Sequence, residues 1–174
     1  SVSFVQSTKT PEELSGELVN SCGQPETLKG DEKIYEISVQ YAKENRNDRK
    51  EGYDCILSFD YACESMELFV NGRKVNDYFY TGQKALFSLG YFDFPTKITT
   101  VLHPLHEGDH IYLQEWPKMD DKKALRNIAT AAHAWPKDPL FREKAQWLRA
   151  KYPDDITTLT VPFTVSSEVR ENQK

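Results

Sequence analysis

The sequence predicts a mainly β protein, a two-sheet β-sandwich or jelly roll that forms a single domain over residues 1–174 with a two-helix insertion at about 120–152. Three observations lead to this fold class. Apolar and polar residues alternate with a period of two in several short segments up to Leu113. Turn residues separate these segments at regular spacing, as in sandwiches and jelly rolls. Between 120 and 152 the apolar period changes to that of a helix.

The first third of the chain predicts two strands and two loops. Residues 1–33 are polar and interrupted by glycine and proline, which predicts an extended entry with one short strand at most, at residues 3–6. The segment 34–41 is predicted to be a half-buried strand, because one face would hold Tyr35, Ile37, Val39 and Tyr41. Residues 43–52 have no apolar side chain and predict a solvated loop.

The middle of the chain has the most regular alternation. In segment 55–61, apolar residues occupy alternate positions from Cys55 to Tyr61. The same alternation holds in segment 66–70, which is followed directly by Asn71-Gly72. Asn-Gly predicts a type I′ hairpin turn, because that turn needs positive φ at both central residues. Further strands are predicted at 73–75, 85–89, 97–102 and 109–113. The predicted core comprises Phe59, Tyr61, Leu68, Val70, Phe87, Leu89 and Ile111.

The last part of the chain predicts two helices and a final strand. Asp120 or Asp121 would cap a first helix with apolar residues at 125, 128, 129 and 132. Asp138-Pro139 would start a second helix, which Pro153 ends. Residues 156–161 return to strand composition, and Pro162 indicates a sheet edge or a bend.

Composition excludes several classes of partner. The formal net charge is −5 and the basic residues are scattered, which argues against nucleic acid or an anionic membrane surface as the partner. No apolar run is long enough to predict a membrane span. The cysteines at 22, 55 and 63 form no CxxC pair, so we expect buried or idle thiols rather than a zinc knuckle. The first residues show no secretion signal, but the chain reads as a piece of a longer protein, so a secreted parent protein stays open.

Two groups of ionisable residues could support chemistry. The segment His103–His110 holds three histidines with two carboxylates, a set that could bind a metal, but His103 and His106 would point to opposite faces of a regular strand. Glycoside hydrolysis needs two carboxyl groups at a defined separation. Four carboxylates are candidates for such a pair, but we interpret them as solvent-exposed surface residues: Asp60, Glu64, Glu67 and Asp77. We therefore predict no catalytic residue, no metal and no cofactor.

The segment 76–82 is the best candidate for ligand binding. It combines aromatic rings with polar side chains between two strands, and a sugar stacks its C–H face on such rings while polar groups bind its hydroxyls. The alternative is that its alternate aromatics point into the core. The predicted carbohydrate-binding residues are Asn76, Asp77, Tyr78 and Tyr80, with Tyr91 and Trp116 as stacking partners.

A resemblance to a known family covers about residues 53–113. The segments 57–61, 66–72 and 77–82, followed by Leu89, Phe92, Pro104-Leu105 and 111–113, resemble the accessory β-sandwich domain of bacterial family 35-like β-galactosidases and related glycoside hydrolases of gut Bacteroidetes. Two features depart from the family pattern. Ala85 stands where a tryptophan is expected, and segment 120–152 lies outside the matched pattern.

The resemblance implies a non-catalytic accessory module of a carbohydrate-active enzyme, either structural or weakly glycan-binding. Its expected partners are a glycan and the catalytic domain of a parent chain, and its expected location is periplasmic or extracellular. Two alternatives stay open. One is a small stand-alone jelly roll, metal-binding or enzymatic, that uses the cluster at residues 103–110. The other is an interaction domain that docks a protein through the helices predicted at residues 120–152.

Overall fold

The computed structural model describes residues 2–41, 53–61, 63–81, 84–106 and 163–171, together with 108 and isolated positions between 137 and 150. The described residues form a mainly β structure, which confirms the predicted fold class. Its elements are β1 (Val2–Gln6), α1 (Pro11–Ser15), β2 (Lys33–Val39), β3 (Tyr53–Tyr61), β4 (Ser65–Val70), β5 (Arg73–Phe79), β6 (Ala85–Ser88), the 3-10 turn η1 (Gly90–Phe92), β7 (Lys97–His103) and β8 (Phe163–Glu171).

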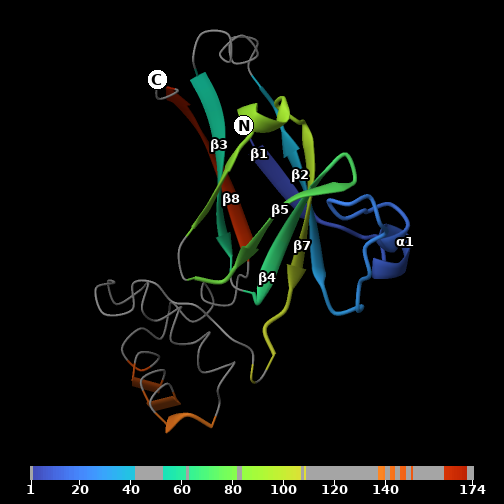
Figure 1. The fold of residues 1–174 in the computed structure, drawn as a ribbon. Helices are drawn as coiled ribbons and strands as arrows, with labels where there is room; N and C mark the ends of the chain where they lie inside the picture. Colours follow the sequence, from blue (N-terminus) through green and yellow to red (C-terminus); the bar gives the residue numbers. More distant parts are fainter. Residues whose placement is uncertain are drawn as a thin grey trace.

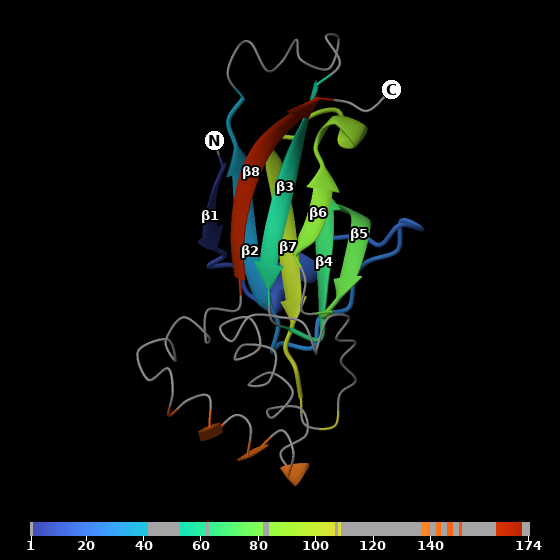
Figure 2. The same ribbon diagram turned by 90° about the vertical axis from the view of Figure 1, so that its left-hand side faces the viewer.

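The strands form two antiparallel sheets that face each other (Figures 1 and 2). The five-stranded sheet has the order β1-β2-β7-β4-β5, and the three-stranded sheet has the order β6-β3-β8. The pairing is nested along the chain: β4 pairs with β5, β3 with β6 and β2 with β7, while β1 contacts β8. This nested order of antiparallel strands is the topology of a jelly roll.

The main core lies between the two sheets, where the period-two pattern predicted it. On β3, the side chains from Cys55 to Tyr61 at alternate positions are buried, with Leu57 and Phe59 fully enclosed. Of the predicted core residues, Phe59, Tyr61, Leu68, Phe87 and Leu89 are buried. Val70 is only half-buried and packs against the edge of this core. Ile111 lies outside the described residues.

A second, smaller core lies on the outer face of the five-stranded sheet. Leu14 and Leu18 of the segment 7–32, here named the cover segment, pack on Ile34, Phe69 and Val101 of that face. The helix α1 within this segment was not predicted, because five residues are too few to show a helical period. Its start is nevertheless encoded: Thr10 and Glu13 form a reciprocal capping box ahead of the first turn.

The cover segment is also tied to the turn between β4 and β5. The Val19 N–H donates to the Gly72 carbonyl at 2.7 Å, and the Lys74 N–H donates to the Val19 carbonyl at 2.9 Å. The predicted Asn-Gly turn is present, with φ of 52° at Asn71 and 77° at Gly72. A Cβ on Gly72 would lie 2.6 Å from the Glu17 carbonyl oxygen, so the close approach of the cover segment requires glycine here.

The predicted two-helix insertion is not supported. Within 120–152, the helical residues that the structure describes are confined to one stretch, at positions 139, 142, 143, 146, 147 and 150. The first predicted helix and the strands predicted at 109–113 and 156–161 lie outside the described residues. No described helix combines the length and the apolar character that crossing a bilayer requires.

The strand β8 follows Pro162 and was missed by the sequence prediction. It begins with the alternating pair Phe163 and Val165, but its later residues are mostly polar and exposed, which hides the apolar period. Pairing along its full length with β3, from Phe163 opposite Tyr61 to Glu171 opposite Tyr53, specifies this strand. The pairing partner is about a hundred residues away in sequence, so no local pattern reports it.

One buried hydroxyl in the main core gives a stability prediction. Thr100 on β7 is fully buried, and its Oγ1 has no hydrogen-bond partner among the described residues. Since a buried unpaired hydroxyl destabilises the folded state, Thr100→Val is expected to raise the free energy of unfolding by about 1–2 kcal/mol in denaturant melts. The control is Thr99→Val on the half-buried opposite face, expected to change stability by less than about 0.5 kcal/mol. A loss of stability in Thr100→Val would contradict the assignment.

Candidate functional site

The segment predicted to be a sugar-binding loop is largely the edge strand β5. Asn76 and Tyr78 are paired opposite the buried Leu68 and Met66, so their side chains lie on the interior face of the sheet. The Asn76 amide donates to the Tyr78 hydroxyl at 2.8 Å, and that hydroxyl donates to the Leu86 carbonyl at 3.1 Å. Burial raises the pKa of Tyr78 to about 12. Tyr78 therefore links β5 to β6 at the edge of the sandwich.

The other predicted residues lie apart from this pair. Asp77 is on the opposite face of β5, where its carboxylate lies 3.3 Å from the Lys74 ammonium. Tyr80 is 2% exposed and contacts the ring of Tyr61 edge-on, as in the core alternative for this segment. Trp116 lies outside the described residues. The structure thus does not bring Asn76, Asp77, Tyr78 and Tyr80 together as one surface.

Tyr91 is the predicted residue with the most accessible ring. Its side chain is 81% exposed on η1, the turn between β6 and β7. The Asp54 carboxylate anchors this turn, since it accepts hydrogen bonds from the Gly90 N–H at 2.8 Å and from the Ser88 hydroxyl. Ser88 Oγ in turn accepts from the Tyr91 N–H at 3.2 Å. The exposed ring is therefore held on a hydrogen-bonded support.

The backbone of this turn, residues 88–94, permits little variation and is named the Tyr91 turn below. A Cβ on Gly90 would lie 2.5 Å from the Asp54 carboxylate oxygen, so the anchor requires glycine at this position. Asp93 and Phe94 both have positive φ, at 62° and 52°. Such conformations cost on the order of 1 kcal/mol or more each for these residue types, and they persist where the surroundings determine them. The Tyr91 turn is pre-organised rather than an open loop.

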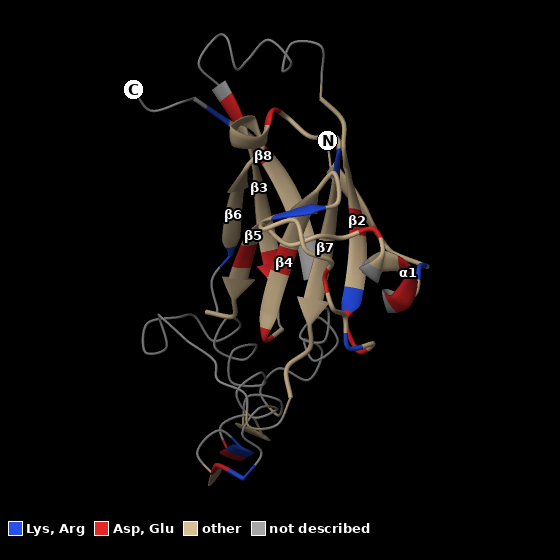
Figure 3. Ribbon diagram, turned by 45° about the vertical axis from the view of Figure 1, so that its right-hand side comes forward, with Lys and Arg blue, Asp and Glu red and all other residues tan. Residues whose placement is uncertain are grey.

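The second candidate region is a network of charged residues on the outer face of the five-stranded sheet, where acidic positions lie side by side on β4 and β5 (Figure 3). His103, the last residue of β7, bonds Glu67 of β4 through Nε2, and its Nδ1 lies 3.8 Å from the Glu32 carboxylate. The Lys74 ammonium lies 3.1 Å from the second oxygen of Glu67. With Glu26, which also hydrogen-bonds Glu67, these residues form what is named here the Glu67–His103 network.

Burial and hydrogen bonds together shift the pKa values of the residues in the network. The hydrogen bond that the His103 ring donates to the Glu67 carboxylate raises the pKa of His103 despite the opposing effect of burial. For Glu67, burial alone would raise the pKa, but hydrogen bonds from His103 and Lys74 outweigh it and lower the value. The pKa of Glu32 is lowered because the Lys29 and Gly30 N–H groups bond its carboxylate and outweigh burial. Burial and the neighbouring Glu67 raise the pKa of Glu26.

The network predicts how the free energy of unfolding depends on pH. Because the folded pKa of His103 is raised, its stabilisation is complete below the ordinary value of 6.5 and is lost as the pH rises through the raised value. Glu67 and Glu32 stabilise the fold above their ordinary value of 4.5, and this contribution is lost as the pH falls through their lowered values. The folded pKa of Glu26 is raised, so its stabilisation, like that of His103, is complete below the ordinary value, here 4.5, and is lost as the pH rises through the raised value.

The measurement is a series of denaturant melts on the wild type and His103→Gln. The wild type is expected to lose stability between about pH 5.5 and about pH 8.5, and the variant to lose less over that range, because it lacks the imidazolium. Groups that do not interact with His103 are common to both proteins and cancel in the comparison. Parallel curves for the two proteins would show that His103 does not hold its proton through Glu67.

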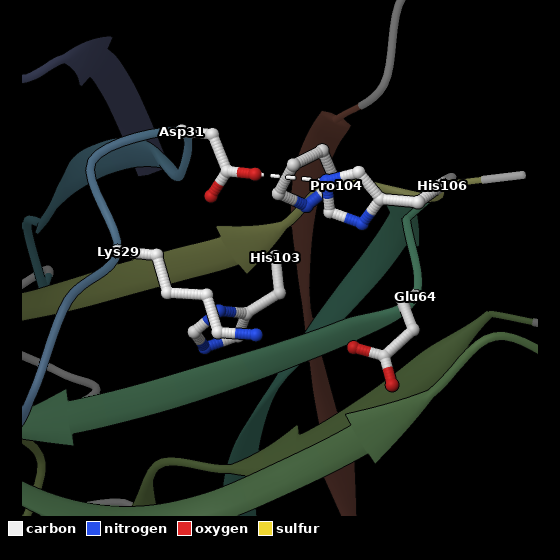
Figure 4. A pocket seen from close by; sticks show the side chains of 6 residues that line it. All are labelled: Lys29, Asp31, Glu64, His103, Pro104 and His106. Carbon is white, nitrogen blue, oxygen red and sulfur yellow. Dashed lines mark hydrogen bonds and ion pairs between the residues drawn. The ribbon is translucent and has the colours of Figure 1, made fainter. Parts of the chain in front are cut away.

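A hollow of about 130 Å³ lies beside the network at the end of β7 (Figure 4). Its lining combines cationic, acidic and imidazole side chains with one proline: Lys29, Asp31, Glu64, His103, Pro104 and His106. His106 Nε2 lies 2.8 Å from the Asp31 carboxylate, whereas His103 faces Glu67. The two histidines therefore engage different carboxylates. Among the described residues, no group of three or more metal-ligating side chains is arranged to hold a metal ion.

Sequence reasoning missed most of this region. Glu67 was interpreted as surface decoration, but it is only 8% exposed, because the cover segment lies over the face that would otherwise be solvated. Glu32 has a fully buried side chain and was not singled out. The signal that could have found Glu67 is its position between Met66 and Leu68 in a strand whose residues are apolar on both faces. Asp109 and His110 of the predicted histidine cluster lie outside the described residues.

None of the three cysteines forms a disulfide; Cys55 and Cys63 are buried and Cys22 is exposed. Comparison of the chain with protein-family models, with curated proteins and with solved structures finds no match.

Proposed function

We propose that this chain is a non-catalytic accessory module of a carbohydrate-active enzyme, with a structural role and weak affinity for glycans. The single observation that supports glycan binding best is the exposed ring of Tyr91 on its anchored turn. Binding residues concentrate on loops held by a rigid scaffold. A tyrosine face covers the apolar side of a pyranose, and the anchored backbone limits the entropy lost on binding.

The state of the charged residues supports a non-catalytic role. The two carboxylates closest to His103 are Glu67 and Glu32, and both are buried against it rather than open to a substrate. Glu67 also neutralises Lys74. Glycoside hydrolysis requires a pair of carboxyl groups that flank the scissile bond, one of them free to donate a proton. Carboxylates that pair with neighbouring cations in this way are not free to donate a proton to a substrate.

The order of the strands is consistent with the family resemblance. The first segments that carry it lie on β3, β4 and β5, which are consecutive strands of the jelly roll, while its last segment, 111–113, lies outside the described residues. In a parent enzyme, such a module would lie beside a catalytic domain supplied by another part of the chain. Its place of action would then be the periplasm or the cell exterior, where polysaccharides are degraded.

The test is a titration with galactose, lactose and galactan oligosaccharides, followed by backbone amide shifts. We expect a Kd on the order of 0.1–1 mM for the best ligand, because one exposed ring buries little surface. Tyr91→Ala should weaken binding about tenfold or more, since the stacking surface is lost. Phe79→Ala is the matched control, because Phe79 is also an exposed aromatic residue, 54% accessible, on the distant strand β5.

The outcomes separate the parts of the proposal. Equal loss of affinity in both variants would indicate a general effect of removing surface aromatics. A flat response of the wild type to every sugar would reject glycan binding and leave the structural role alone.

A further inference from the structure

We propose that the hollow lined by Lys29, Asp31, Glu64, His103, Pro104 and His106 is a binding site for a neutral sugar ring. The inference rests on the proposed function and deepens it, because it names a second place where the module would contact a glycan. The sequence showed the histidines of segment 103–110 and the carboxylate of Glu64 as separate candidates. No local pattern joined them to Lys29 and Asp31, because the lining comes from three distant parts of the chain: the end of the cover segment, the turn before β4, and the residues from the end of β7 onward (Figure 4).

The hydrogen-bonding chemistry of the hollow favours hydroxyl groups. The Glu64 carboxylate only accepts hydrogen bonds, and among the described residues one donor, the Ser65 hydroxyl at 3.2 Å, reaches it. The Lys29 ammonium only donates, and the structure shows no ion-pair partner for it within the described residues. A hydroxyl group both donates and accepts, so a polyhydroxy ring can satisfy both groups at once.

The balance of charge disfavours ionic ligands. An anion would gain the Lys29 ammonium and the His103 imidazolium but would face the carboxylates of Glu64 and Asp31. A cation would gain those carboxylates but would meet Lys29 and the imidazolium of His103. A metal ion would need several ligands to converge, and the described residues offer no such set. A neutral polar ligand avoids both penalties.

The walls of the hollow are held in place before any ligand arrives. His103 is fixed on its inner side by Glu67 and Glu32, and Asp31 holds the ring of His106 at 2.8 Å. Glu32 also accepts the N–H groups of Lys29 and Gly30, at 2.6 Å and 2.8 Å, which fixes the backbone that carries the lysine. The Glu67–His103 network therefore acts as the support of this site, and a pre-organised site loses less entropy when it binds.

The hollow and the Tyr91 turn lie at opposite ends of the sandwich. The hollow is at the end where β7 finishes, and the Tyr91 turn precedes the start of β7 (Figure 1). β7 extends over seven residues from Lys97 to His103, so roughly 20 Å of strand separates the two places. Substitutions at one site should leave the other site intact, which allows each to be tested alone.

The experiment follows amide shifts of the whole chain during titration with galactose, the neutral probe, and with galacturonate and galactosamine as anionic and cationic probes. Galactose is expected to shift the amides of residues 29–31, 64 and 103–106 with a Kd on the order of 1 mM, and the charged sugars to bind more weakly. Glu64→Gln and Lys29→Met are each expected to weaken this response about fivefold to tenfold, because each removes one charge-assisted hydrogen bond. Glu12→Gln, at an exposed position on α1, is the matched control.

The possible results separate the hollow as a binding site from the glycan binding proposed for the Tyr91 turn. Shifts confined to the Tyr91 turn, lost in Tyr91→Ala and kept in Glu64→Gln, would overturn the hollow as a site and leave the proposed function standing. Shifts at the hollow that survive Tyr91→Ala but fall in Glu64→Gln and Lys29→Met would support the hollow. Tighter binding of galacturonate or galactosamine than of galactose would overturn the assignment to a neutral ring. No shift with any probe would overturn the hollow and remove the glycan-binding part of the proposed function.

Discussion

Phe59→Ala is expected to lower the free energy of unfolding by about 3–5 kcal/mol, because it removes a fully buried aromatic ring and leaves a cavity. Phe59 lies on β3, the middle strand of its sheet, and its ring has no exposed surface. Its strand neighbours on either side, β6 and β8, are held by backbone pairing and relax only partly into the space. The measurement is the midpoint and slope of a denaturant melt.

Leu86→Ala provides the matched control on the neighbouring strand. Leu86 is 50% exposed on the outer face of β6, so its truncation is expected to cost less than about 1 kcal/mol. A small effect of Phe59→Ala with a large effect of Leu86→Ala would mean that the two faces of the three-stranded sheet are assigned the wrong way round.

Glu67→Ala is expected to lower the free energy of unfolding by about 2–4 kcal/mol near neutral pH, because it removes the buried carboxylate that two charged partners under the cover segment share. Those partners are His103 and Lys74, whose side chains are only 21% and 25% exposed. The raised pKa of His103 is then also expected to fall, since the hydrogen bond from its ring to the Glu67 carboxylate is the main cause of the rise. The readouts are a denaturant melt and the titration of the His103 ring by NMR.

Asp77→Ala distinguishes this effect from a general loss of surface charge. Asp77 lies directly opposite Glu67 in the β4–β5 pairing and contacts the same Lys74, but its side chain is 54% exposed. Exposed ion pairs contribute little, so a cost below about 1 kcal/mol is expected. Equal costs for Glu67→Ala and Asp77→Ala would show that burial by the cover segment does not strengthen the network.

The sequence allowed only some residues of the candidate sites to be predicted. Tyr91 was predicted to be a stacking residue, and its ring is exposed in the structure. The residues around Tyr91 gave no signal that Asp54, 37 residues earlier, would hold the turn by hydrogen bonds. Asp77 and Tyr78 were placed in one binding surface because they are adjacent in sequence. Once they form part of a strand, adjacency puts them on opposite faces, since side chains alternate across a sheet.

Local signals in the sequence were enough to predict the jelly-roll strands whose apolar face meets the core, from Ile37 through the hairpin at Asn71-Gly72 to Ile98, because a period of two and a turn residue are read from a few neighbouring positions. What covers the second face of the large sheet depends instead on tertiary contacts. That face would be solvated in an open sandwich, but the cover segment buries Phe69 and Glu67 on it. The same holds for β8, whose polar residues form a strand through pairing with β3. In each case the deciding contact joins residues distant in the chain, and the energy of such a contact depends on burial and pairing that no single segment encodes.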